Sequence, residues 1–465
     1  MTASRRPRSR QAELFARSKR SVIEIAPTHR LVMITEETDW TELEELVQAI
    51  RRSKLKNEAG RPPHLRALIG AVVFRALRRM TYRDTEDQIR HYAPARYLCG
   101  LTETDWTPDA NTIQDFEQLL GEDGVKKLNE HVVKWAVEEK LADPTVVAAD
   151  TTAQEAAVPY PNEMRLMATF VSAIAAASKN VGAVLQGFVK RAGGLFRAAK
   201  TKLREFRLFA KTKSKAARSR LASAMASIVH QVQRGLAGGL ARASGQARRL
   251  TKHRKAAWRR IQQLHQTMQR LLPQIRYWIR TGFVAKNKIV SLYIPEIYAI
   301  LRGKIGKPIE FGLNWGIERL RGGFLLATLA KDKLELMDSR FAVRAVKDHQ
   351  ALFGKAPTSY AYDRAGSSEE NVAALKKLGV SHVGLAPRGK AKWRVRGRVK
   401  ARLISERAQV EGGIGAIKSG KYGFNRPPAK SAAAMGVCGQ RAVLGFNLNK
   451  LMNGLAERRR VVLVG

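Results

Sequence analysis

One stretch of the chain limits strongly what the protein can fold into. Residues 164–290 hold 28 Lys and Arg but a single acid, Glu205. Because an unpaired buried charge is costly, these basic side chains must lie in water. Apolar residues recur there at three- and four-residue spacing, from 203 to 232 and again from 257 to 278, on either side of a glycine-rich break at 235–245. The pattern predicts an antiparallel helical hairpin with a coiled-coil-like seam and a basic exterior.

The whole chain shares this imbalance. Its 465 residues include 84 Lys and Arg against 40 Asp and Glu, a formal net charge of +44. With 45% hydrophobic residues the chain can still bury a core, so it is not a disordered polycation. Such a charge argues against an ordinary metabolic enzyme. It indicates a polyanionic partner, which is DNA, RNA or, less readily, an anionic membrane.

No segment of the sequence points to secretion or to a membrane span. The two cysteines, Cys99 and Cys438, are too few for a disulfide framework. The longest conspicuous uncharged run, 166–178, has 13 residues, fewer than the roughly 18 that a spanning helix needs. The basic first twenty residues lack the apolar core of a signal peptide. We therefore expect a cytoplasmic, nucleoid-associated protein with no membrane partner.

Apolar periodicity predicts a mixed α/β fold with a helical domain before it. The expected segments are a basic arm (1–40), a helical domain (41–140), the first strand of an α/β domain (141–163), the basic helical insertion (164–290), the rest of the α/β domain (291–455) and a tail (456–465). Strands are expected at 144–150, 308–316, 324–330, 358–363 and 380–386. Helices are expected at 339–352, 367–378, 403–419 and 431–455, the second with a capping box of Ser367 and Glu370.

Three carboxylates stand out by their position in this pattern. Asp150 and Asp363 each end a predicted strand, and Glu411 lies on a predicted helix between two basic segments. Metal-assisted phosphoryl transfer uses such acids, because two Mg²⁺ ions must be held by hard carboxylate oxygens. Arg407 and Lys418 fall on the same helix face as Glu411, within roughly 40°. A carboxylate there could reach a metal while the two cations reach phosphates.

The order of these acids resembles a known family. Acids after the first strand, after the fourth strand and on the helix after the fifth are similar to the RNase H-like fold of DDE transposases from bacterial insertion sequences. Arg407-x3-Glu411-x6-Lys418 matches part of their helix signature, in which Ile404 stands where Tyr is usual. Asp150-Thr151-Thr152 resembles the segment after their first Asp.

The resemblance extends to the N-terminal helical domain, and covers roughly residues 41–165 and 285–450. It includes Tyr82-Arg83-Asp84 and Thr107-Pro108-Asp109, which resemble parts of the helical domain of these transposases. The basic insertion has weaker support from the family.

The resemblance implies a metal-dependent transposase. Asp150, Asp363 and Glu411 would bind two Mg²⁺ or Mn²⁺ ions, while Arg407 and Lys418 would contact phosphates of double-stranded DNA. The implied reaction is hydrolysis at inverted-repeat ends, followed by attack of the freed 3′-hydroxyl on target DNA. Synapsis of two ends would make a homodimer.

The basic run at 387–402 holds eight Lys and Arg and no acid. It supplies further candidates for contacts to DNA. These are Trp393, which could stack on a base, and Arg394, Arg396 and Arg398.

Structural explanations remain open for each of these residues. A strand can end on Asp for turn chemistry alone, Glu406 competes with Glu411, and Glu155 is either an extra acid or a surface residue. Arg407 and Lys418 could be a solvated helix face. Two other functions also remain: a nuclease on the same fold that cuts without joining, and a catalytically degenerate DNA-binding protein.

Overall fold

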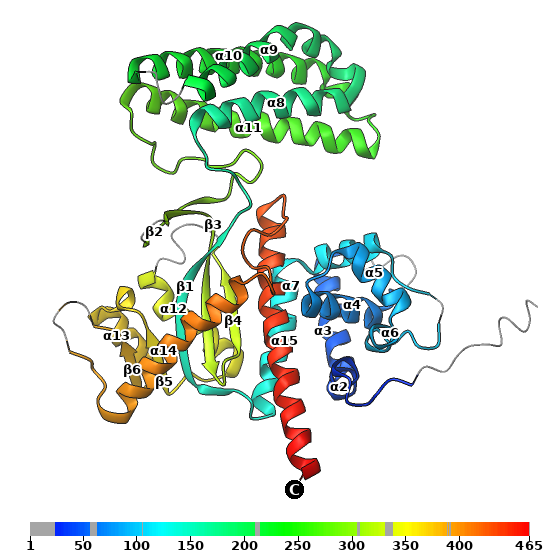
Figure 1. Cartoon of the computed structure of the whole chain (residues 1–465), viewed down its shortest axis with the longest axis vertical. Coiled ribbons are helices and arrows are strands. Elements are labelled where there is room, and N and C mark those ends of the chain that lie inside the picture. Colours follow the sequence, from blue (N-terminus) through cyan, green and yellow to red (C-terminus); the bar gives the residue numbers. More distant parts are fainter. Residues whose placement is uncertain are drawn as a thin grey trace, which may run out of the picture. The chain divides into compact units, whose positions relative to one another are not determined.

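The computed structural model describes residues 24–55, 63–104, 106–209, 214–304, 307–330, 338–387, 389 and 392–464 (Figure 1). Most of the expected basic arm, and Arg388 and Lys390 of the basic run, lie outside this set. The chain forms two compact units, one made of residues 1–128 and 444–465 and the other of residues 129–443. Together they give a mixed α/β fold in which N-terminal helices precede a mixed sheet flanked by helices.

The first unit is entirely helical over its described residues. It contains α2 (Arg30–Glu37), α3 (Trp40–Lys54), α4 (Leu65–Arg78), α5 (Tyr82–His91), α6 (Ala93–Leu98), the first part of α7 (Ala110–Glu138) and the end of α15 (Ala432–Val464). Thr81 and Asp84 form the capping box that begins α5. Asp109 accepts a hydrogen bond from the Thr112 backbone N–H at 2.8 Å and so caps α7.

A buried ion pair lies at the centre of this helical unit. Arg75 on α4 contacts Glu117 on α7, with 2.7 Å from Nη1 to Oε1. The Tyr82 hydroxyl also donates to Glu117, and its ring lies 3.7 Å beneath the Arg75 guanidinium. The carboxylate is therefore satisfied from two sides, as burial requires. Tyr82 and Asp84, two residues that carry the resemblance, thus have structural roles here.

The second unit is built on a six-stranded sheet. Its strands are β1 (Asp143–Glu155), β2 (Tyr298–Lys304), β3 (Lys307–Arg321), β4 (Leu325–Leu329), β5 (Ser359–Tyr362) and β6 (His382–Leu385), in the order β2-β3-β1-β5-β6 with β4 paired to β3. β1 is antiparallel to β3 and parallel to β5, and β5 is parallel to β6. All five expected strands are present, and β2 was not expected.

Helices cover both faces of this sheet. On one face α14 (Gly397–Lys418) packs Leu403 and Val410 against Ala148 of β1 and Ala361 of β5. On the other face α12 (Asp338–Phe353) packs Phe341 over Gly316, where a Cβ would lie only 2.1 Å from the ring. α13 (Glu369–Lys377) contacts α12 and β6.

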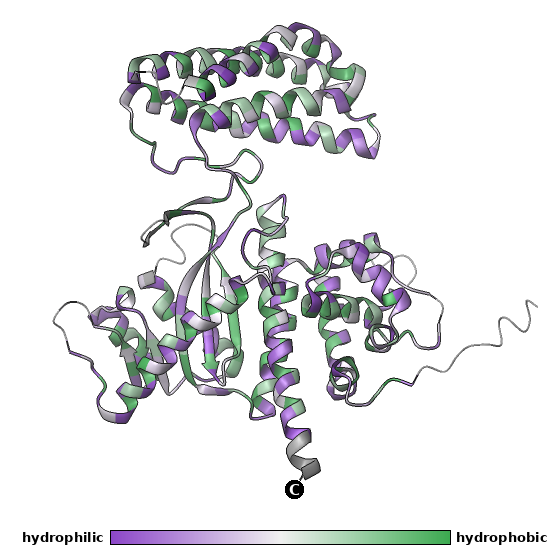
Figure 2. Ribbon diagram, in the orientation of Figure 1, coloured by the Kyte–Doolittle hydropathy of each residue, from purple (hydrophilic) through white to green (hydrophobic). Residues whose placement is uncertain are grey.

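The basic insertion is a helical bundle rather than the two-helix hairpin that the sequence predicted. It comprises α8 (Glu163–Val181), the 3-10 turn η1 (Gly182–Leu185), α9 (Gln186–Phe209), α10 (Lys215–Ala247) and α11 (Lys252–Thr281). The expected break at 235–245 is wrong, because α10 continues through these glycines. Figure 2 shows hydrophilic and hydrophobic residues alternating along these helices, and the apolar ones share a single core.

One helical stretch of the bundle, Glu163–Leu208, is long and apolar enough to cross a membrane by length and composition alone. Several of its large apolar side chains, such as Phe170 and Ile174, are fully buried in the core of the bundle. A core helix of a folded domain meets the same criteria, so the stretch is weak evidence for a membrane span.

Several expected boundaries also need correction. β1 does not end at Asp150 but runs to Glu155, because β3 pairs with it along its whole length. Ser368, not Ser367, caps α13 through the Asn371 backbone N–H. α14 begins at Gly397, six residues earlier than expected. α15 continues to Val464 through the predicted tail.

Candidate active site

The parallel register of β1 and β5 places two of the predicted acids side by side. Ala148 pairs with Ala361, and Asp150 and Asp363 each follow two residues later. Because side chains alternate along a strand, both acids belong to the sheet face that bears these alanines, which is the face covered by α14. Asp150 accepts from the Thr151 backbone N–H at 2.8 Å, and Asp363 from that of Arg364 at 2.6 Å.

The helical phase of α14 brings the third acid to the same place. Leu403, Val410 and Ile414 form the stripe that packs on the sheet. At about 100° per residue, Arg407, Glu411 and Lys418 lie together on one flank of this stripe, roughly 40–80° from Leu403. Glu406 and Gln409 lie on the opposite flank. One helix therefore presents two distinct sets of polar side chains to the sheet.

Arg407 links two of the three predicted metal ligands. Its Nη2 lies 3.0 Å from Asp363 Oδ1 and 3.8 Å from Glu411 Oε1. The Arg407 and Asp363 side chains are each 35% exposed and that of Glu411 is 66% exposed, so the group is open to solvent. The single positive charge of the guanidinium offsets one of the two negative charges of Asp363 and Glu411. The expected helix motif and the expected strand-end acid are thus in direct contact.

Lys418 ends α14 and is partly exposed. Ile404, at the position where Tyr is usual, is 42% exposed. Both side chains are therefore at least partly accessible, so a polyanion could reach them.

The structure assigns structural contacts to the two rival acids. Glu406 is buried and pairs with Arg319 of β3, which also donates to Gln409. These contacts hold one flank of α14 on the sheet. Glu155 is 9% exposed and accepts from Arg426 at 3.1 Å, so it ties the segment after α14 to the end of β1.

The four candidates of the basic run differ in their surroundings. Trp393 is partly buried and packs against the cluster of Ala148, Ala361 and Val410. Arg394 is exposed and pairs with Glu369 of α13. Arg396 and Arg398, at the start of α14, are exposed.

The carboxylates suit a hard cation in chemistry, although they are not gathered around one point. Asp150, Asp363 and Glu411 offer the oxygen ligands that Mg²⁺ and Mn²⁺ prefer. Within the described ranges, no three or more His, Cys, Asp or Glu side chains are grouped so that they could hold a metal ion. Arg407 lies between the second and third acids in this arrangement. Metal binding by the three acids would therefore require Arg407 to move away from Asp363, its nearer partner, and from Glu411.

The far side of the sheet holds a buried polar cluster. His349 of α12 lies 3.8 Å from Glu318 of β3, measured from Nδ1 to Oε2. Burial lowers the pKa of His349 to about 4, so the imidazole is neutral near pH 7. Burial also raises the pKa of Tyr360 well above its usual value, with smaller contributions from Tyr362 and Glu318.

Comparison with known proteins connects the helical unit to a family. Residues 21–119 match the family described as Transposase domain (DUF772). The N-terminal region is thus a transposase domain. This indicates a transposase, and a transposase binds DNA. No curated protein and no solved structure matches the chain.

Sequence reasoning missed the residues that support the site. Arg319 stands next to Glu318 and two residues before Arg321, so the local sequence carries little signal that it has a buried partner. Nothing in the sequence alone could have identified Glu406 as that partner. Their contact joins elements 87 positions apart and depends on how α14 crosses the sheet.

Proposed function

We propose that the chain is a DDE transposase with an RNase H-like catalytic domain. Its substrate would be the double-stranded DNA ends of its own element. The observation that carries the proposal is the meeting of Asp150, Asp363 and the Glu411 helix on one sheet face. Leaving out the edge strand β2, Asp150 lies on the first strand, Asp363 follows the fourth and Glu411 lies on the helix after the fifth, the order expected of this fold. The transposase domain at residues 21–119 supports it independently.

Asp150, Asp363 and Glu411 would hold two Mg²⁺ or Mn²⁺ ions. When bound, these ions would stabilise the charge on the scissile phosphate and lower the pKa of the attacking water or 3′-hydroxyl. Asp150 would be positioned by β1 and by its hydrogen bond to the Thr151 backbone. The shared edge of β1 and β5 would fix the spacing of the first two carboxylates.

Arg407 would have two roles in this proposal. In the free protein it reduces the repulsion between Asp363 and Glu411 by contacting both. When DNA arrives, a phosphate offers the guanidinium another anionic partner, and Arg407 would turn toward it and free Asp363 and Glu411 for the metal. Lys418, on the same flank, would bind a neighbouring phosphate. Unchanged end binding and activity in Lys418→Ala would exclude that role.

The proposed reaction has two phosphoryl transfers and no covalent protein intermediate. Water first attacks the phosphodiester at the transposon end and leaves a free 3′-hydroxyl. That hydroxyl then attacks a target phosphodiester in line, so one bond forms as another breaks. Synapsis of two ends would require two copies of the active site, which is the reason to expect a homodimer.

A joining assay tests this function against its alternatives. The purified chain is incubated with Mg²⁺ or Mn²⁺, DNA carrying the sequences that flank its gene, and a supercoiled target plasmid. A transposase gives both cleaved ends and plasmids with covalently joined ends. Cleavage without joined product would identify a nuclease, and binding with neither product would identify a degenerate DNA-binding protein.

A further inference from the structure

The helical bundle formed by α8–α11 has far more positive charge than it can balance. Between residues 163 and 281 the sequence has only two acids, Glu163 and Glu205. Glu163 pairs with Lys288, with 2.5 Å from Nζ to Oε1, and Glu205 pairs with Lys202 at 3.0 Å. Neither carboxylate is therefore left to neutralise the remaining Lys and Arg. The bundle needs anions from outside to reduce its self-repulsion.

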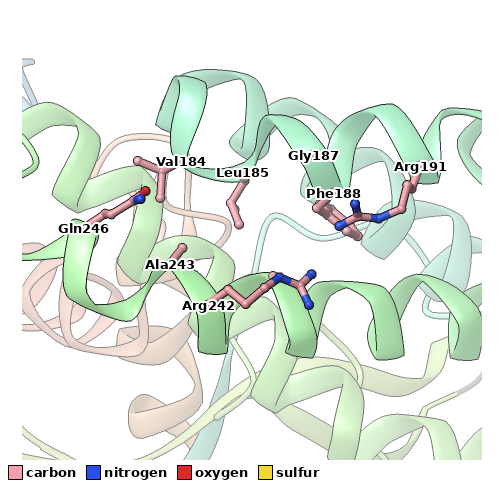
Figure 3. A pocket seen from close by; sticks show the side chains of 9 residues that line it. Val184, Leu185, Gly187, Phe188, Arg191, Arg242, Ala243 and Gln246 are labelled. Atoms are coloured by element: carbon pink, nitrogen blue, oxygen red, sulfur yellow. The ribbon is translucent and has the colours of Figure 1, made fainter.

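A small notch lies where α10 crosses η1 and the start of α9. Its volume is about 140 Å³, and Figure 3 shows Arg191 and Arg242 reaching toward Phe188 from the two facing helices. Leu185 and Phe188 are buried and form its apolar floor. The rest of the lining is Val184, Gly187, Gly239, Ala243 and Gln246.

Glycines create the space for this notch. A Cβ at Gly239 would lie 3.3 Å from Leu185 Cδ2 and 3.4 Å from Phe188 Cβ, so glycine lets α10 approach the notch floor closely. A Cβ at Gly238 would lie 3.3 Å from an Arg242 guanidinium nitrogen. The glycines that the sequence suggested as a helix break therefore shape a concave, basic surface.

The two arginines of the notch are available to bind an anion. Both are exposed. Across the described ranges, neither guanidinium has a hydrogen bond or an ion pair. Two like charges converging on one notch repel each other, and a single anion between them would relieve that repulsion. A phosphate suits the place well, because guanidinium groups bind its oxygens in a fork-like geometry.

We propose that this notch binds one backbone phosphate of DNA. The bundle would then be a second DNA-binding surface, formed by residues separate from the carboxylate site. That the polyanion is DNA rests on the proposed function. That the notch binds an anion rests on its own geometry and charge. A lipid phosphate is the less favoured source, because an interfacial helix needs an exposed apolar face, and the large apolar residues of this notch are buried.

Binding of a random-sequence duplex to the full chain tests the proposal. Fluorescence anisotropy is measured in EDTA for the wild type, Arg191→Ala, Arg242→Ala and the double variant, over a salt series from about 50 to 200 mM. We expect the double variant to bind about five- to tenfold more weakly near 0.1 M salt, and its salt slope to fall by about one. The two single changes should be non-additive, because both guanidiniums bind the same phosphate.

A matched pair of exposed bundle arginines serves as the control. Arg234→Ala with Arg276→Ala removes the same charge from α10 and α11 outside the notch. If this pair weakens binding as much as the notch pair does, general electrostatics suffices and the notch proposal is wrong. Additive effects of Arg191→Ala and Arg242→Ala would also contradict it.

A vesicle-binding assay distinguishes a DNA-binding notch from a lipid-binding one. Sedimentation with vesicles of phosphatidylglycerol and phosphatidylcholine is compared for the wild type and the notch double variant. If the double variant loses vesicle binding but keeps wild-type DNA binding, the notch is a lipid site and the proposal fails. DNA binding is measured in EDTA, so it does not depend on metal-dependent catalysis. The joining assay tests the proposed function whether or not the notch binds DNA.

Discussion

At the scale of single residues, α14 carries two glutamates with opposite surroundings. Glu406 is buried against Arg319, whereas the Glu411 side chain is 66% exposed on the other flank. Glu406→Gln should lower the free energy of unfolding by about 3 kcal/mol, because Arg319 would lose its buried partner. Glu411→Gln should change it by less than about 0.5 kcal/mol. Urea unfolding of both variants measures the difference.

The same pair of variants separates a structural from a catalytic role. Glu411→Gln should remove DNA cleavage in a protein as stable as the wild type. If Glu411→Gln proves the less stable variant, the assignment of the two flanks is wrong.

His349 gives the fold a pH dependence that is independent of the site. Its pKa is about 4 in the folded protein and near 6.5 when exposed, because burial disfavours the imidazolium. Below pH 6.5 the unfolded chain binds a proton that the folded chain does not, so acid favours unfolding. We expect stability to fall between about pH 6.5 and 4, by up to about 3 kcal/mol from this residue. His349→Gln should flatten the profile of unfolding midpoint against pH in that range, and an unchanged slope would contradict the argument.

At the scale of elements, the sequence predicted the strands and helices whose bounds are determined by neighbouring residues. The strands β5 and β6 and the helix α12 lie within two residues of their expected bounds, because apolar runs and nearby turns define them. The order of strands and acids could also be inferred. The contact of Arg407 with Asp363 could not, since it depends on the angle at which α14 crosses the sheet.

Non-local pairing explains the elements that were missed. β2 forms on the edge by pairing with residues 307–312 of β3, and Leu301 of β2 is 79% exposed, so the sequence of this strand carried little apolar signal. α10 stays helical through its glycines because tertiary packing outweighs their weak helix propensity. The contact of Gly239 with Leu185 and Phe188 is part of that packing.

Two helical glycines of the second unit should respond in opposite directions to the same change. A Cβ at Gly439 of α15 would lie 2.3 Å from the buried Trp315 ring, whereas one at Gly415 of α14 would meet nothing within 4 Å. Gly439→Ala should therefore lower stability by about 1–3 kcal/mol through overpacking. Gly415→Ala should raise it by about 0.5–1 kcal/mol through helix propensity. Thermal unfolding of both variants tests this, and a stabilised Gly439→Ala would refute the close approach of α15 to Trp315.

At the scale of the whole molecule, the net charge of +44 has an uneven distribution. Much of it lies in the helical bundle, whose acids are both already paired. The three proposed catalytic acids lie instead on a sheet face beside Arg407 and Lys418. A chain with this distribution can hold a polyanion over broad surfaces while presenting a small negative site to it. DNA binding and DNA chemistry should therefore be separable by mutation.

The most direct test of the account is a transposition assay of Asp363→Asn and Glu411→Gln, with binding to the element's ends measured in parallel. Asp348→Asn, which removes an acid from a surface pair with Arg344, is the control. The account predicts that the two site variants lose at least about 100-fold in transposition, because metal ligation supplies several kcal/mol to the reaction, while end binding and the control stay near wild type. Wild-type transposition by either site variant would contradict the account.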